Sequence, residues 1–503
     1  MTPQEAYGKL TTEMKRISTI ASSMSVLHWD LETYMPPAGS AHRGEQMSAI
    51  SGLVHEMFIA PEVGEWISAV EGSGLVTDPL SDAAVNVREL RRQYDRATKI
   101  PTTLVEEFSR VTARAHHEWL EARAESDFSK FQSSLARIIE LNREQAACID
   151  PHADAYDTLM DDYEPGMTSA EMSGVFAKLA EELPDLVEEI VSSDTQPDGS
   201  IFDRPYDLPS QKTFAHVLSS VIGLDLNGAT IHTTVHPFCS CPGPGDVRVN
   251  TRYNHNDVSD MVFSVLHEDG HAIYDQGLDP AHYGLPRGEA VSLGIHESQS
   301  RMWENFVGRS HAFWEYMLPI ARGIFPEALR GVSVDEFYFV ANKVDRGFIR
   351  VEADEVTYNL HVLLRFEMEQ RIIRGDIAVA DIPGAWNARF KELLHVEVPN
   401  DTKGCLQDVH WSGGSFGYFP TYTLGNLYSA QIYNTAGKEL GDLDAQFRVG
   451  DFTTLREWLN KKVHTHGMRY RASDLVKEIT GEPLTHTYLM DHLKGKLGPL
   501  YKL

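Results

Sequence analysis

A short stretch of the chain reads His267-Glu268-Asp269-Gly270-His271, which is the H-E-x-x-H pattern. On a helix, positions i and i+4 lie on one face, so both histidines can direct a ring nitrogen at one cation. Glu268 can then take a proton from water at the metal and pass it to a leaving amine. Two surface histidines on a helix are the plain alternative. However, apolar residues flank the motif, so a buried helix is expected, in which polar groups need partners. The pattern therefore predicts a zinc-type site.

A catalytic zinc site needs a third protein ligand and one open position. Glu297, in the sequence HESQS, follows 26 residues after His271, which is enough chain to finish one helix and bring a second alongside. Two histidines and a glutamate are the thermolysin-type ligand set. The neighbouring His296 is an alternative ligand or a substrate contact. Ligating histidines are usually oriented by carboxylates, and three candidates stand nearby: Asp269, Glu304 and Asp275.

The elements around these residues are predicted to be mainly α-helical. Apolar residues recur every three or four positions over residues 106–121, 131–148 and 171–190. Pro184 is expected to kink or break the third of these helices, and residues 193–200 are expected to form a loop.

The middle of the chain predicts a change of structure. Residues 230–253 hold β-branched residues interrupted by proline and glycine, which predicts two short strands joined by a loop. Helices are expected again over 257–276, 287–308 and 335–375. Residues 404–426 are rich in glycine and aromatic residues and predict an ordered loop that leads into a helix.

The composition excludes several classes of protein. The chain has 503 residues with a net charge of −28, so a nucleic-acid partner is not expected. It has no apolar run long enough to span a membrane and no visible signal peptide, so a cytoplasmic protein without a membrane partner is expected. Its cysteines are predicted to be free thiols: Cys148, Cys239, Cys241 and Cys405.

Several further motifs occur in an order that resembles the thermostable-carboxypeptidase family of zinc metallocarboxypeptidases. They are HPF at 236–238, DVRVN at 246–250, HEDGH at 267–271, HESQS at 296–300, IRVEAD at 349–354 and GCLQDVHW at 404–411. Asn250 stands where the family motif has threonine, which puts the hydrogen bonding of its loop in doubt. LHWD at 27–30 also looks like the family's helical opening, so the resemblance extends over the chain.

The resemblance implies a large, almost wholly helical metallopeptidase fold with a deep substrate groove and one small β-hairpin-like piece. Residues 1–503 are expected to form one metallocarboxypeptidase domain, with a helical part over 1–200 and the zinc site and groove over 201–503. The family implies a homodimer that removes single amino acids from peptides with a free C-terminus by zinc-activated water attack. One Zn²⁺ per chain is implied, for which Co²⁺ or Mn²⁺ can substitute.

Recognition of a free C-terminal carboxylate calls for an arginine, whose planar fork fits a carboxylate. Arg350 is the first candidate, predicted to lie on the long helix with Asp354 and Tyr358 on the same face. A structural Arg350–Asp354 pair is the alternative. Arg248 is the second candidate, and His236 is predicted to shape the substrate groove or to be an ordinary loop histidine.

Peptide hydrolysis also needs a group that stabilises the developing oxyanion. His410 and Tyr422 are candidates, because both follow Asp408 in the loop rich in glycine and aromatic residues. Each is otherwise an ordinary buried polar group.

Two other functions fit the metal motif. An oligopeptidase that cuts internally would use the same zinc chemistry without a carboxylate-binding arginine. A metal-binding scaffold or peptide-binding protein without catalysis is the third possibility. Glu268 argues against the scaffold, because structural zinc needs no adjacent base and usually has four protein ligands.

Overall fold

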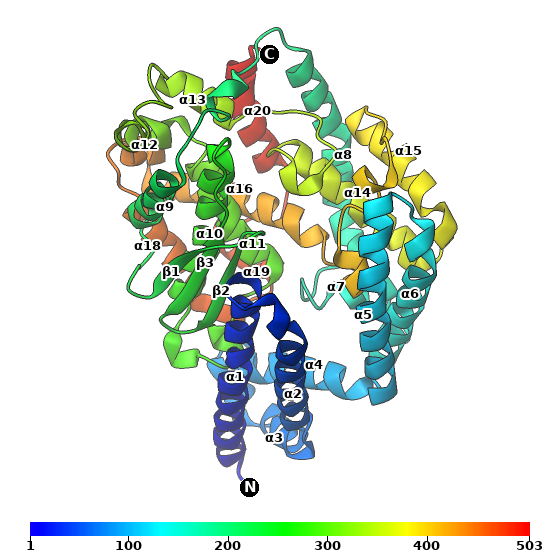
Figure 1. The fold of residues 1–503 in the computed structure, drawn as a ribbon. Helices are drawn as coiled ribbons and strands as arrows, with labels where there is room; N and C mark the ends of the chain where they lie inside the picture. The colour runs from blue at the N-terminus through cyan, green and yellow to red at the C-terminus, as the bar shows by residue number, and fades with distance from the viewer. The chain divides into compact units, whose positions relative to one another are not determined.

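Helices make up most of the chain in the computed structural model, which describes residues 1–503, and one small sheet accompanies them (Figure 1). This confirms the predicted fold class. The chain forms two compact units. Residues 1–97, 197–341 and 429–483 make up unit 1, and residues 98–196, 342–428 and 484–503 make up unit 2.

Unit 1 contains the N-terminal helices, the sheet and the H-E-x-x-H motif. Figure 1 shows α1 and α2 in dark blue as a long helical hairpin. The helices of unit 1 are α1 Pro3–Thr33, α2 Ser40–Phe58, α3 Pro61–Glu71, α4 Asp82–Lys99, α9 Leu208–Ile222, α10 Val258–Gly277, α11 Leu293–Arg301, α12 His311–Ile324, α13 Val334–Ala341, α17 Leu443–Arg448, α18 Thr453–Lys462 and α19 Ala472–Thr480.

Unit 2 is helical throughout. Its helices are α5 Thr102–Glu125, α6 Ser129–Ile149, α7 Ala155–Met160, α8 Ser169–Ser192, α14 Thr357–Arg374, α15 Ile382–Leu394 and α20 Thr487–Tyr501. Helix α16, Pro420–Leu440, begins in unit 2 and ends in unit 1. The three predicted N-terminal helices correspond to α5, α6 and α8, and α8 continues through Pro184 without a break. None of the helices combines the length and the apolar character that a membrane span needs.

The sheet has three strands where the sequence predicted two. They are β1 Ala229–Thr233, β2 Phe238–Gly243 and β3 Asp246–Thr251, in the order β1-β3-β2. β1 pairs with β3 in parallel, and β2 pairs with β3 in antiparallel. The unpredicted strand β2 contains Pro242, which lacks an N–H group. The strand tolerates this proline because it lies at the edge of the sheet.

The helix that carries the H-E-x-x-H motif begins as predicted. Asp257 caps α10, since its side chain accepts hydrogen bonds from the N–H groups of Ser259 and Asp260. The single helix predicted over 287–308 begins later, because Ser292 caps α11 by accepting from the N–H of Ile295. The chain then continues into a π-helix, η6, over Met302–Val307.

The single helix predicted over 335–375 is wrong. Two helices, α13 and α14, are separated by residues 342–356, within which Arg350–Glu352 form the short 3-10 helix η7. Asp354 sets the start of α14, because its carboxylate accepts hydrogen bonds from the N–H groups of Val356 and Thr357 and from the Thr357 hydroxyl. Gly375 ends α14 in the left-handed conformation, at the predicted position.

Candidate active site

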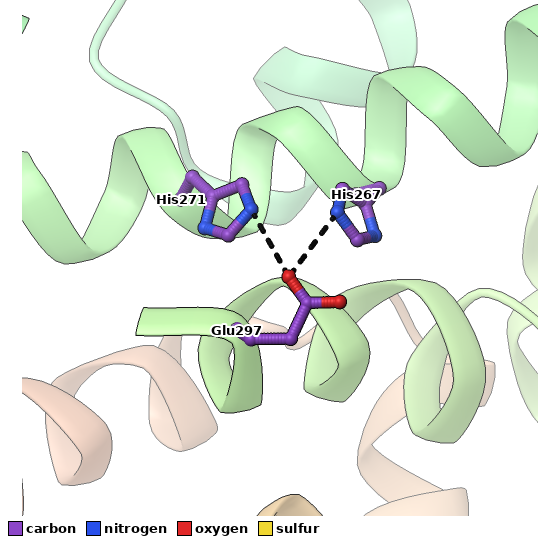
Figure 2. A group of neighbouring side chains, drawn as sticks. All are labelled: His267, His271 and Glu297. Atoms are coloured by element: carbon purple, nitrogen blue, oxygen red, sulfur yellow. Dashed lines mark ion pairs between the residues drawn. The ribbon is translucent and has the colours of Figure 1, made fainter. Parts of the chain in front are cut away.

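Three of the predicted metal-ligating side chains lie together in unit 1. His267 and His271 project from α10 toward Glu297 on α11 (Figure 2). The Glu297 Oε2 atom lies 3.7 Å from His267 Nε2 and 3.6 Å from His271 Nε2. Ligand atoms of a tetrahedral site with bonds of about 2.1 Å lie about 3.4 Å apart, so this donor set fits one small divalent cation.

Gly270 explains how α11 comes so close to α10. A Cβ atom at this position would lie 2.5 Å from Ser300 Cα and 2.6 Å from the Gln299 carbonyl oxygen. No other residue type fits without moving backbone atoms. The glycine inside the motif therefore brings the third donor within reach of the two histidines.

Among the three carboxylates considered as partners of the histidines, Glu304 is the one that contacts a ligating ring. His267 Nδ1 lies 2.9 Å from Glu304 Oε2, which orients Nε2 toward Glu297. Asp275 instead pairs with His296 Nε2 at 3.1 Å, and Asp269 is fully buried without a hydrogen bond to either histidine. His296 is absent from the group of converging donors, and its ring stacks on His271.

Glu268 is buried in α10 beside the first histidine, with an exposed fraction of 6%. Burial raises the pKa of its carboxyl group to about 7. A cation nearby would favour the ionised form and lower that pKa. Burial and a cation therefore act on this pKa in opposite directions, which suits a carboxylate that first accepts and then returns a proton.

Arg350 belongs to a second group of polar side chains, which lies in unit 2. Arg350 Nε donates to Asp408 Oδ1 at 3.0 Å, and Nη1 donates to the Tyr358 hydroxyl at 3.0 Å. Arg365 contacts the other oxygen of the same carboxylate, Asp408 Oδ2. The prediction that Arg350 lies on the long helix is wrong, because Arg350 lies on η7. The alternative, a structural Arg350–Asp354 pair, is not formed, because Asp354 caps α14.

The remaining predicted residues of unit 2 surround this arginine. The Tyr422 ring centroid lies 4.9 Å from Arg350 Cζ. His410 packs against Phe419, which also lies near Arg350. Burial lowers the pKa of His410 to about 4, so its ring is neutral at pH 7 and can donate a hydrogen bond.

A buried glutamate anchors the loop that carries these aromatic rings. Glu369 Oε1 accepts a hydrogen bond from Trp411 Nε1 at 2.9 Å. Glu369 Oε2 accepts from the Tyr156 hydroxyl and from the N–H of Gly417, both at 3.0 Å. Neither Glu369 nor Tyr156 was a predicted site residue, since their burial is a tertiary feature without a local sequence signal.

Arg248 and His236 lie in unit 1, near the sheet. Arg248 Nε and Nη2 both donate to Asp246, and its guanidinium lies over the Trp29 ring. His236 is exposed in the loop before β2. Asn250, where the family motif has threonine, accepts from Trp29 Nε1 and donates to the carbonyls of Phe238 and Arg248. Threonine, with a single hydroxyl, cannot make all three bonds.

Comparison with known proteins places this geometry in a family. The model of the carboxypeptidase Taq (M32) metallopeptidase family matches residues 9–497. The chain belongs to this family. The thermostable carboxypeptidase 1 of Thermus thermophilus is 45% identical over 511 residues and is covered completely, as is this chain. Carboxypeptidase 1 of Bacillus subtilis is 36% identical, with 97% of each chain covered.

Solved structures of other proteins have the same fold. The M32 carboxypeptidase from Deinococcus radiodurans superposes with a TM-score of 0.96 at 36% identity, covering 99% of this chain and 100% of that one. The metallocarboxypeptidase 1 of Trypanosoma cruzi gives 0.93 at 32% identity, covering 98% and 99%. The chain is therefore a carboxypeptidase of the metallopeptidase class, and its family implies a divalent metal. The His267, His271 and Glu297 donor set fits such an ion.

One polar residue at the metal centre was missed by the sequence analysis. Arg301 donates through Nε to Glu297 Oε1 at 2.8 Å and through Nη1 to Glu304 Oε2 at 3.0 Å. The spacing of Glu297, Arg301 and Glu304 along the chain, at i, i+4 and i+7, is the signal that could have found it, because such positions share one helical face.

Proposed function

We propose that this metallocarboxypeptidase uses zinc, releases single amino acids from peptide C-termini and employs Glu268 as the general base and acid. The observation that carries the proposal is the convergence of His267, His271 and Glu297 beside a buried glutamate. Two histidines and one carboxylate are a ligand set of catalytic zinc, which leaves one position for water or substrate. Co²⁺ and Mn²⁺ are proposed as substitutes.

A bound divalent cation supplies a Lewis acid that polarises the scissile carbonyl and lowers the pKa of water. Glu268 takes one proton from the attacking water as the new C–O bond forms. It then gives that proton to the amide nitrogen as the C–N bond breaks. The products are a free amino acid and a peptide shorter by one residue, and Glu268 returns to its starting state.

Roles in substrate binding are proposed for the other predicted residues, each taken by itself. Arg350 receives the terminal carboxylate, a role supported by its burial and by the two hydrogen bonds that fix the orientation of its guanidinium group. His410, as a neutral donor, and Tyr422 are proposed to stabilise the oxyanion. Arg248 and His236 are proposed to shape the substrate site. The homodimer, the cytoplasmic location and the single functional domain over 1–503 stay predictions.

The test compares one peptide with a free C-terminus and the same peptide amidated, each incubated with the enzyme with and without a chelator. Mass spectrometry should show stepwise loss of C-terminal residues from the free peptide alone, and only without chelator. Equal internal cleavage of both peptides would indicate an oligopeptidase. No cleavage of either, with metal bound, would indicate a binding protein without catalysis.

Variants assign the roles within this reaction. Glu268→Gln should keep the metal and lose about 10²–10⁴-fold in turnover, the usual contribution of a general acid–base group. Near-native turnover would remove Glu268 as the base. Arg350→Met should weaken binding of the peptide with a free C-terminus far more than binding of the same peptide amidated, measured as competitive inhibition of the cleavage of a second peptide. Arg365→Met is the matched control, since it also breaks a bond to Asp408, and its losses should not depend on the C-terminus.

A further inference from the structure

Arg301 connects two carboxylates of the candidate metal centre, Glu297 and Glu304. Its guanidinium donates to Glu297 Oε1 on one side and to Glu304 Oε2 on the other. Glu304 Oε2 also lies 2.9 Å from His267 Nδ1. One arginine thus contacts a donor carboxylate directly and a donor histidine through one intermediate carboxylate.

The hydrogen bond from Arg301 gives the two oxygens of Glu297 different surroundings. Oε1 is bonded to Arg301 Nε, whereas Oε2 faces both histidines and lies 3.2 Å from the Ser300 hydroxyl. With Oε1 bonded to Arg301, Oε2 is the oxygen that Glu297 presents to the two histidines. The rotation of the Glu297 side chain is therefore limited before any cation arrives.

The π-helix that follows α11 places the second carboxylate. Glu304 lies in η6, Met302–Val307, and Arg309 Nη2 donates to its Oε1 at 3.1 Å. Both oxygens of Glu304 are thus hydrogen-bonded. Side chains of Arg301 and Glu304 are 13% and 11% exposed, so little water competes for these bonds. Single π-helical turns occur often at functional sites.

We propose that Arg301 is a positioning residue that fixes Glu297 to offer one oxygen and, through Glu304, fixes His267 to offer Nε2. The inference rests on the proposed metal function of these donors. It adds that the ligand geometry is set by the protein, by a residue that does not contact the metal.

Charge alone makes the opposite prediction, which allows a sharp test. A guanidinium group repels a nearby cation. If its charge were the only effect of Arg301, removal of this residue would tighten metal binding. Removal of a positioning residue weakens it, typically 10- to 100-fold for the outer partners of metal ligands. The sign of the change therefore distinguishes the two roles.

The experiment measures Zn²⁺ and Co²⁺ dissociation constants of the full chain by competition with a chelator, together with the visible absorption of the Co²⁺ form at saturation. Arg301→Met and Glu304→Gln should each weaken binding 10- to 100-fold and alter the Co²⁺ spectrum. Arg301→Lys should behave like Arg301→Met, because lysine keeps the charge but cannot hold both carboxylates in a planar fork.

Arg287→Met is the matched control. Arg287 is also a buried arginine of unit 1, with 5% of its side chain exposed, and it pairs with Asp82 at 2.7 Å. This variant should lower stability and leave metal affinity unchanged. Thermal unfolding of each metal-free variant shows which variants fold. If Arg301→Met does not fold, Arg301→Lys and Glu304→Gln provide the test.

Unchanged or tighter metal binding by folded Arg301 variants would overturn the proposal, as would an unchanged Co²⁺ spectrum. Failure of the wild-type chain to bind Zn²⁺ or Co²⁺ would instead overturn the proposed function on which it rests. The two failures are thus distinguished by the wild-type measurement alone.

Discussion

At the scale of single residues, Glu369 shows how burial and hydrogen bonding oppose each other. Burial in unit 2 raises the pKa of this carboxyl group to about 7, although three donors favour its ionised form: Trp411, Gly417 and Tyr156. The unfolded chain has an ordinary glutamate pKa near 4.3. Between these values the folded protein holds a proton that the unfolded chain has lost.

Stability should therefore fall through this group as pH rises from about 5 to 8, because the folded state binds more protons over that window. The glutamine in Glu369→Gln cannot ionise. The free energy of unfolding of the wild type minus that of this variant should therefore decrease by up to ~3 kcal/mol as the pH rises across the window. Urea unfolding of both proteins at several pH values measures the difference. Exposed Glu181 in α8 provides the control variant, Glu181→Gln, which makes the same substitution on the surface of the same unit. A pH-independent difference for Glu369→Gln would mean that Glu369 stays ionised.

At the scale of elements, the metal centre depends on the close packing of α10 and α11. Gly270→Ala would place a methyl group against Ser300 Cα and the Gln299 carbonyl, which are backbone atoms that cannot rotate away. We expect a loss of about 1–3 kcal/mol in stability, the usual cost of overpacking, and weaker Zn²⁺ binding because Glu297 moves with α11. Thermal unfolding and chelator competition measure the two effects.

The control for this prediction is Gly437→Ala in α16. A Cβ at Gly437 meets no atom within 4 Å. Alanine in an open helical position should leave metal binding unchanged and raise stability by up to about 1 kcal/mol. If Gly270→Ala behaves like Gly437→Ala, close packing at Gly270 is not what brings Glu297 to the histidines.

The sequence predicted the elements whose signals are local. The spacing within HEDGH and the apolar residues around it predict α10 well, and Glu297 follows from the need for a third ligand. The break between α13 and α14 was missed, because a capping side chain at Asp354 overrides a continuous helical pattern. Arg350 consequently lies on η7 and pairs with Asp408, a partner 58 residues away that no helical periodicity can indicate.

Tertiary contacts account for the other differences. Strand β2 contains proline and glycine and forms because β3 offers it a partner at the sheet edge. The π-helix after α11 places Glu304 beside His267, while periodicity alone predicted a regular helix there. Motif spacing thus predicted three side chains that converge in the structure, whereas the residues that hold them in place depend on the folded structure.

At the scale of the whole molecule, the predicted metal ligands all belong to one of the two units. His267, His271 and Glu297 lie in unit 1, which is assembled from three separate segments of the chain. A ligand that binds only the folded state stabilises it by RT ln(1 + [L]/Kd), which is about 4 kcal/mol at 1,000 times Kd. This free energy is added to the free energy of local unfolding of the unit that holds the ligand.

Removal of the metal should therefore speed amide hydrogen exchange in unit 1 by up to about 10³-fold, first in peptides that cover α10, α11 and η6. Peptides from α6, α8 and α14 of unit 2 should exchange at their original rates, because their amides are protected by a separate set of helices. Hydrogen exchange with mass spectrometry, with Zn²⁺ and after chelation, measures both. A uniform increase over both units would mean that they unfold as one cooperative structure, and no increase in unit 1 would mean that the donor set binds no metal in solution.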